Sequence, residues 1–208
     1  MHVAAERPEN LFRSSYHVAS SMGTLILLEM VFSREQAVWV ATGFAMLAWT
    51  LELSRRHVTG VNELLMRMLG PIAHRHEWHR VNSATWFGTG LAFIAPVFAT
   101  PTLALAIVCA GLGDPAAGFI GRRYGHTKLV HGRSLEGTIA YAVASFLGCL
   151  AVLALWHGNI PPSRGLLAAG VAAVTGALTE LFASKVDDNF IVPITVSLAV
   201  GLVFGGAV

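Results

Sequence analysis

The side chains best suited to chemistry are carboxylates inside or beside long apolar segments. They are Asp114, Glu136, Glu180, Asp187 and Asp188. A carboxylate is costly to place at membrane depth, so a residue of this kind is expected to serve a function. Carboxylates are also ligands that Mg²⁺ takes where it binds substrate phosphates. The alternative is that each one pairs with a nearby arginine or reaches water, and for Glu52, beside Arg55 and Arg56, both interpretations stay open.

A basic, glycine-rich stretch lies between these acids. Its residues of interest are Gly118, Gly121, Arg122, Arg123, Lys128, Arg133 and Ser134. Glycines let backbone amides approach an anion, and basic side chains neutralise phosphate oxygens. Ser134 is expected to cap a helix, which leaves free amides nearby for an anion. The glycines alone also fit close helix packing in a membrane. Their order with the acids indicates a site for a metal-bound nucleotide.

The composition places this chemistry in a membrane protein. Of the 208 residues, 54% are hydrophobic and 12% are charged, against about 25% charged in a typical soluble domain. A soluble chain of this length could not hide so much apolar surface, and disorder requires the opposite composition. The net charge of +2 is too small to suggest a nucleic-acid partner.

Apolar segments predict an all-α bundle with about seven transmembrane helices in one membrane-embedded domain, residues 1–208. The expected helices are 15–33, 35–53, 83–98, 101–120, 136–156, 165–184 and 190–207, with Pro101 in a first turn. Twelve of the 14 Lys and Arg residues then lie on one side, and only Arg34 and Arg164 lie on the other. This bias puts the N-terminus and the carboxylates on the cytoplasmic side, as in a bacterial-type inner or plasma membrane.

Other signals are weaker. Residues 61–69 predict a short amphipathic helix on the membrane surface. His76 and His79 are one helical turn apart, but a zinc site needs more convergent ligands. Glu29 is expected to face water or Arg34. His17 is either a packing residue or a nucleotide contact beside Arg13.

At these positions the chain resembles the CTP-dependent lipid kinases, a group that includes dolichol, phytol and CTP-using diacylglycerol kinases and is distantly related to phosphatidate cytidylyltransferase. The similar motifs are Asn10-x-x-Arg13-x-x-x-His17, residues 77–85, Asp114-Pro-Ala-Ala-Gly118, Gly121-Arg-Arg-Tyr-Gly125, Lys128, Gly132-Arg133-Ser134-Leu135-Glu136-Gly137 and Asp187-Asp188-Asn189-Phe190-x-x-Pro193. Cytidylyltransferases carry a Lys-Lys-Thr-x-Glu-Gly type stretch and a C-terminal signature that are absent here. Many relatives have Ser or Thr where this chain has Pro115, so a hydroxyl near the metal is missing.

The resemblance implies roles for individual residues. Asp114 with Asp187 or Asp188 would hold Mg²⁺, and Glu136 would bind metal or fix Arg133. The expected nucleotide-binding residues are Arg13, His17, Gly118, Gly121, Arg122, Arg123, Lys128, Arg133, Ser134 and Asn189. Asp114 is the first choice for the base that accepts the alcohol proton, and Glu180 is its rival.

The sequence therefore predicts a kinase that transfers a phosphoryl group from CTP, with Mg²⁺, to a membrane alcohol such as diacylglycerol, a polyprenol (dolichol) or phytol. The expected partners are the nucleoside triphosphate, the lipid alcohol and membrane lipids, and a homodimer is compatible with the sequence. One alternative is a cytidylyltransferase-like enzyme that forms a CDP-lipid. The other is a small membrane transporter or lipid scaffold without enzymatic activity.

Overall fold

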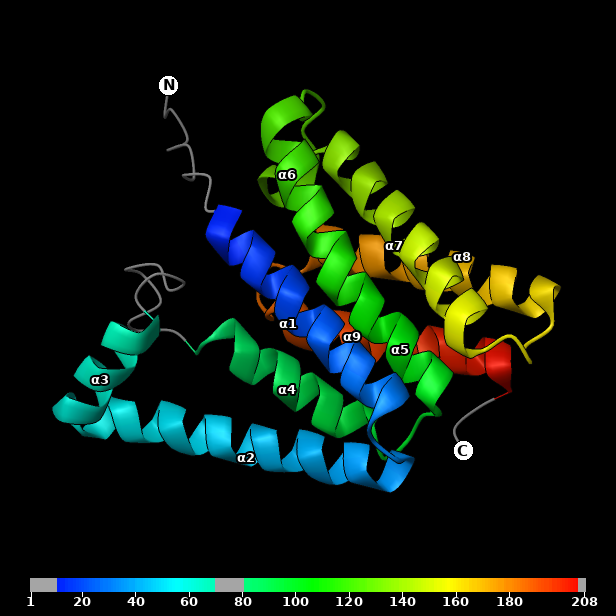
Figure 1. The fold of residues 1–208 in the computed structure, drawn as a ribbon. Helices are drawn as coiled ribbons and strands as arrows, with labels where there is room; N and C mark the ends of the chain where they lie inside the picture. The colour runs from blue at the N-terminus through cyan, green and yellow to red at the C-terminus, as the bar shows by residue number, and fades with distance from the viewer. Residues whose placement is uncertain (1–10, 70–80, 206–208) are drawn as a thin grey trace.

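A computed structural model describes residues 11–69 and 81–205, with the side chains of residues 11–13, 66, 68 and 69 left undescribed. Within these ranges the chain is helical (Figure 1). The helices are α1 Leu11–Met30, α2 Arg34–His57, α3 Thr59–Leu69, α4 Ser83–Ile94, α5 Thr100–Val108, α6 Asp114–Tyr124, α7 Leu135–Trp156, α8 Pro162–Phe182 and α9 Asp188–Phe204. A π-helical turn, η2 Cys109–Gly113, joins α5 to α6, and a short 3₁₀ turn, η3 Val130–Gly132, precedes α7.

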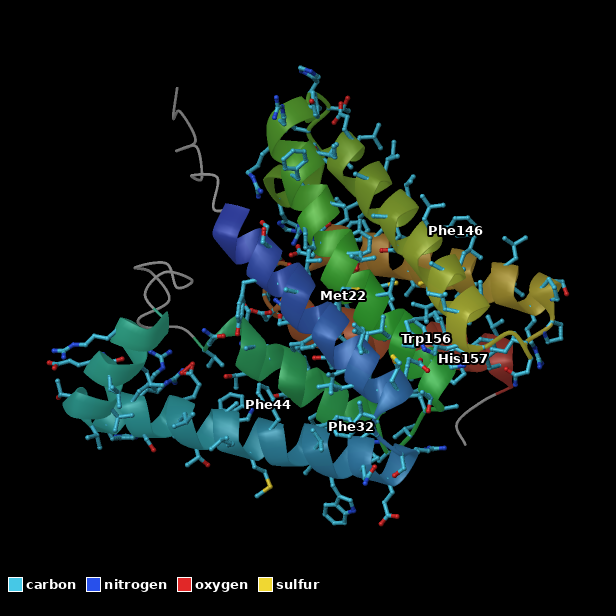
Figure 2. All side chains as sticks on the ribbon, viewed as in Figure 1. Met22, Phe32, Phe44, Phe146, Trp156 and His157 are labelled. Atoms are coloured by element: carbon cyan, nitrogen blue, oxygen red, sulfur yellow. The ribbon has the colours of Figure 1, made fainter. Side chains whose placement is uncertain are left out.

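The helix formed by α5, η2 and α6 is the centre of the bundle. Residues 103–110 are all buried, and α1, α7, α8 and α9 pack around them. Partly buried side chains such as Met22, Phe146 and Trp156 pack against this core (Figure 2). On the other side, α4 packs between α9 and α2, and α3 folds back from the end of α2 (Figure 1).

Local sequence signals fix several helix starts. The Ser134 hydroxyl accepts a hydrogen bond from the Gly137 N–H at 3.2 Å, so the predicted cap of α7 is confirmed. Pro101 lies in the first turn of α5, as expected, because its missing N–H has no partner to lose there. The predicted amphipathic helix at 61–69 is also found, as α3.

The predicted all-α fold is confirmed for the described residues, and part of the predicted set of membrane-spanning helices is found. Four helices in the described part of the chain are long and apolar enough to cross a membrane: Arg34–His57, Thr100–Tyr124, Leu135–Trp156 and Pro162–Phe182. The other three expected spans fall short of that standard. α4 has 12 residues and α9 has 17, and α1 is rich in serine near its start. The count of seven therefore stays a prediction.

A buried ion pair and a long-range hydrogen bond hold the outer helices in place. Glu52, with 3% of its surface exposed, pairs with Arg55 on α2 and accepts the Asn82 N–H at 2.8 Å. The interpretation that Glu52 pairs with a nearby arginine is therefore confirmed. Glu29 binds the His157 Nε2 at 2.9 Å, which ties α1 to the end of α7. The expectation that Glu29 faces water or Arg34 is wrong, because a residue 128 positions away supplies its partner.

Candidate active site

Arg133 connects three segments of the chain. It lies just before α7, and its guanidinium pairs with Glu180 near the end of α8. Its Nη2 also lies 3.4 Å from an Asp188 carboxylate oxygen at the start of α9 and 3.4 Å from the Ala183 carbonyl oxygen. Three predicted site residues that are up to 55 positions apart therefore meet at one end of the bundle.

The junction between α8 and α9 presents two adjacent carboxylates. Asp187 caps α9 by accepting the Asn189 N–H at 3.0 Å. The Asn189 side-chain amide donates to Asp187 at 3.0 Å and to Asp188 at 3.2 Å. Asn189 is buried and holds the two carboxylates beside each other, and its predicted nucleotide contact stays a prediction.

Asp114 is the first residue of α6, directly after the π turn. Gly113, the residue directly before it, lies against the ring of Tyr141 on α7. Two glycines allow this tyrosine its position. A Cβ on Gly113 would lie 2.6 Å from its ring, and a Cβ on Gly176 would lie 3.0 Å from its hydroxyl oxygen. Since Gly176 precedes Glu180 by one turn of α8, the tyrosine lies beneath the group of carboxylates.

Tyr141 is a candidate functional residue that the sequence analysis missed. It is fully buried, and within the described ranges its hydroxyl has no hydrogen-bond partner. A buried polar group without a partner is unusual and calls for an explanation. The sequence did offer a signal for it. Tyr141 is a polar aromatic residue about two turns into an apolar helix whose start is capped by Ser134.

The basic loop between α6 and α7 folds as a small hairpin. The Leu129 N–H donates to the Arg133 carbonyl at 2.7 Å, and the Leu135 N–H donates to the Thr127 carbonyl at 2.9 Å. Lys128 therefore lies opposite Ser134. The turn is made by His131 at φ 56° and Gly132 at φ 76°, a conformation that glycine adopts at little cost.

The basic residues divide into two groups by exposure. Arg122, Arg123 and Lys128 are exposed, whereas Arg133 is partly buried among carboxylates. Glu136, predicted to bind metal or to fix Arg133, accepts the Thr127 N–H at 3.0 Å in this structure. It thereby holds the hairpin against the start of α7, and its metal-binding role stays a prediction.

Of the predicted glycines, Gly121 lies at the contact of α6 with the start of α7, and Gly118 faces Arg122 of its own helix. A Cβ on Gly121 would lie 3.0 Å from the Ser134 hydroxyl, and one on Gly137 would lie 3.0 Å from the Ala117 carbonyl. A Cβ on Gly118 would lie 3.0 Å from its neighbour Arg122. These positions give the glycines a packing role, and their contact with nucleotide stays a prediction.

His17 lies on α1 and donates from Nε2 to the Ala110 carbonyl of the π turn at 3.1 Å. Because a carbonyl only accepts, Nδ1 of a neutral ring is left as an acceptor. The Arg13 side chain lies outside the described residues, as do His76 and His79.

The donor set suits Mg²⁺ better than zinc. Among the described residues, no group of three or more His, Cys, Asp and Glu side chains could hold a metal ion. Mg²⁺ requires fewer protein ligands, because one or two carboxylates with substrate phosphates and water complete its octahedron. Asp187 and Asp188 at the α8–α9 junction, and Asp114 at the start of α6, are carboxylates of this kind.

The chain is similar in sequence to several lipid kinases. CTP-dependent diacylglycerol kinase 1 of Saccharomyces cerevisiae is 25% identical over 204 residues, which cover 89% of this chain and 70% of the relative. A probable chloroplastic phytol kinase 2 of Oryza sativa is 28% identical, with 94% of this chain and 67% of the relative covered. These relatives support the CTP-dependent lipid kinase family.

A chloroplastic farnesol kinase of Arabidopsis thaliana is 33% identical over 110 residues, which cover 49% of this chain and 36% of that protein. No family model and no solved structure matches the chain. All these relatives are named as kinases of lipid alcohols, which supports a phosphotransferase over a transporter. The CTP-dependent lipid kinases among them also favour kinase chemistry over cytidylyl transfer.

Proposed function

We propose that this chain is a CTP-dependent kinase that phosphorylates a membrane lipid alcohol. The observation that carries the proposal is the convergence of Arg133, Glu180 and Asp188, which joins the basic hairpin to the carboxylates of the α8–α9 junction. Phosphoryl transfer needs little from a protein beyond positioning and charge neutralisation, and this arrangement offers both. The relatives named as CTP-dependent diacylglycerol kinase, phytol kinase and farnesol kinase support the donor and the class of acceptor.

In the proposed mechanism the basic residues hold the triphosphate. Lys128, Arg122 and Arg123 contact its phosphates from the exposed side, and Arg133 reaches them from the side of the carboxylates. The nucleotide contacts predicted for Arg13 and His17 stay predictions. Mg²⁺ would be held by one or two of the carboxylates of Asp114, Asp187 and Asp188 together with phosphates and water, and it would neutralise charge that develops on the phosphates.

The proton of the alcohol goes to a carboxylate. The alcohol oxygen attacks the γ-phosphorus, the bond to the β-phosphate oxygen breaks, and CDP leaves with that electron pair. We assign the base to Asp114, because Glu180 is occupied by Arg133. Glu180 is then a positioning residue, which keeps the guanidinium directed at the triphosphate.

We further propose the membrane placement. The single domain crosses the membrane seven times, with the shorter helices α4 and α9 inserted between the longer ones, and the site faces the cytoplasm. The charge bias between the two sides supports this topology. A bacterial-type membrane and a homodimer stay predictions.

The decisive experiment offers γ-labelled CTP or ATP with Mg²⁺ and a panel of lipid alcohols to the purified protein. A kinase transfers the label to the lipid and releases CDP, and Asp114→Asn abolishes the transfer. Release of pyrophosphate with formation of a CDP-lipid would establish the cytidylyltransferase instead. Failure to bind CTP with Mg²⁺ would contradict both enzyme assignments and leave the transporter.

A further inference from the structure

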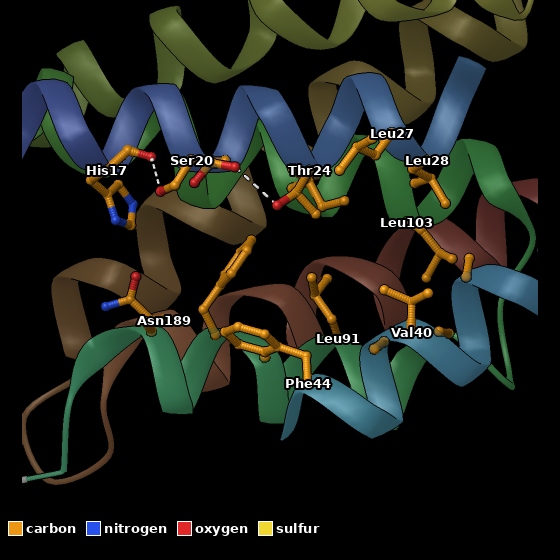
Figure 3. A pocket seen from close by; sticks show the side chains of 18 of the residues that line it. His17, Ser20, Thr24, Leu27, Leu28, Val40, Phe44, Leu91, Leu103 and Asn189 are labelled. Atoms are coloured by element: carbon orange, nitrogen blue, oxygen red, sulfur yellow. Dashed lines mark hydrogen bonds between the residues drawn. The ribbon is translucent and has the colours of Figure 1, made fainter. Parts of the chain in front are cut away.

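A groove of about 350 Å³ runs between α1, α2 and α4. Figure 3 shows α1 along one side of this groove and α2 and α4 along the other. It extends on α1 from Tyr16 to Leu28, which is ~18 Å at the helical rise per residue, and continues to Phe32 beyond the end of α1. The roles proposed above for the carboxylates do not involve this groove.

The two ends of the groove differ in polarity. One end is lined by Leu28, Phe32 and Leu103, and side chains of this kind also line its middle, with Phe44 and Leu91. The other end carries His17, Ser20 and Asn189, and in Figure 3 the His17 ring and the Asn189 amide lie at the same end of the groove. A cavity that is apolar along its length and polar at one end matches a molecule with a hydrocarbon tail and one polar head.

The polar end adjoins the proposed active site. Asn189 holds the carboxylates of Asp187 and Asp188. His17 is bonded to Ala110, which precedes Asp114 by four residues, or ~6 Å along the helix. With Nε2 engaged by that carbonyl, the Nδ1 acceptor of a neutral His17 is available to a hydroxyl.

We propose that this groove holds the hydrocarbon tail of the alcohol and that its hydroxyl lies at the polar end, next to His17 and Asn189. The proposal rests on the kinase function and deepens it by naming the shape of the acceptor. A cavity of about 150 Å³ holds one benzene ring. By that scale a groove of about 350 Å³ takes one chain of roughly fifteen carbons. The groove therefore fits one hydrocarbon chain, and a single-chain alcohol is the preferred acceptor, because the second tail of a diacylglycerol would lie outside the groove.

The test is a chain-length profile. The far part of the groove can be filled by Val40→Trp, since Val40 lines it and is 47% exposed, so that a larger side chain displaces no core residue. The matched control is Met46→Trp, on the same helix, 67% exposed and outside the groove. We measure kcat/KM for single-chain alcohols of about ten, fifteen and twenty carbons and for diacylglycerol, with γ-labelled CTP.

The unmodified protein should prefer the alcohol of about fifteen carbons over diacylglycerol at least tenfold. Val40→Trp should lower kcat/KM for that alcohol at least tenfold and leave the shortest alcohol unchanged, and Met46→Trp should keep the original profile. The same profile in Val40→Trp and Met46→Trp, or a preference for diacylglycerol, would overturn the proposal.

A second measurement separates this proposal from the kinase function. An alcohol with a photoreactive group at the end of its tail is cross-linked to the protein without nucleotide, and the labelled peptides are identified. Labelling near Leu28 and Leu103 supports the groove even if no alcohol is phosphorylated, in which case only the kinase function fails. Labelling confined to the outer faces of α7 and α8 would exclude the groove whatever the activity.

Discussion

Two clusters of arginine and carboxylate in this structure look similar and differ in construction. In the first, Glu52 and Arg55 lie three residues apart on one helix, and both are buried. The Glu52 carboxylate also accepts a hydrogen bond from the backbone N–H of Asn82. In the second, Arg133 reaches Glu180 and Asp188 from a different segment, and its side chain is 24% exposed.

The difference separates a structural ion pair from a site. A local, buried and satisfied pair can only hold its surroundings in place, since no charge is left to meet a ligand. In a cluster formed by three segments and open to solvent, the arginine can exchange a carboxylate partner for a phosphate. The Arg133 guanidinium, which is suited to two-point contacts with oxyanions, is the group that makes this exchange possible.

The largest expected effect is on Arg133. Arg133→Ala should lower kcat for lipid phosphorylation by on the order of 10³-fold, because the charge opposite the transferred phosphoryl group is lost. Arg133→Lys keeps the charge without the planar fork and should recover only part of the activity. Initial rates with γ-labelled CTP measure both variants. Wild-type kcat in Arg133→Ala would place the phosphate contacts elsewhere.

Glu52→Gln tests the other cluster. Removing one member of a buried ion pair leaves its partner uncompensated, so we expect the free energy of unfolding to fall by roughly 3 kcal/mol. Thermal unfolding in detergent measures the loss. The kcat of the protein that remains folded should be unchanged, and a fall in kcat without a loss of stability would assign Glu52 to the site.

Lys128→Ala should have a smaller effect. Lys128 is exposed on the hairpin, and one lost charge contact to a phosphate raises the KM for CTP about tenfold with little change in kcat. Steady-state kinetics with varied CTP checks this, and Gln in place of exposed Arg164 on the opposite side serves as the control. A change in kcat alone would argue against a simple binding contact.

Tyr141→Phe should have the smallest effect. Removing a buried hydroxyl that has no partner in the described part of the chain should raise the free energy of unfolding by about 1 kcal/mol. If that hydroxyl serves the bound nucleotide, kcat falls severalfold in the same variant. Unfolding and kinetics of one preparation give both numbers, and a variant that is less stable yet fully active would show that the tyrosine only packs.

Much of the fold could be predicted because each signal was local. Ser134, Pro101 and the apolar runs gave the starts and positions of helices within a few residues. The partner of Glu29 could not be predicted, since His157 lies at the far end of another helix and only packing brings the two together. The shortness of α4 was hidden for a related reason, since its apolar run continues past its last helical residue.

The site divides in the same way. The residue types and their order around Arg133 and Asp188 pointed to phosphate chemistry from the sequence alone. Their contact could not be derived, because it depends on how α8 ends and α9 begins. The role of Tyr141 could not be predicted, because its neighbours Gly113 and Gly176 have no side chains whose chemistry would indicate a contact.

The π turn at Cys109–Gly113 sets the rotation of α6 about the helix axis relative to α5. It accommodates about one residue more than an α-helical turn of the same length, and one residue corresponds to ~100° of rotation about the helix axis. Without it, Asp114 would be rotated by about this angle relative to α7 and α9. The orientation of a carboxylate in the middle of the bundle thus depends on a single extra residue, a change in length rather than in side-chain chemistry.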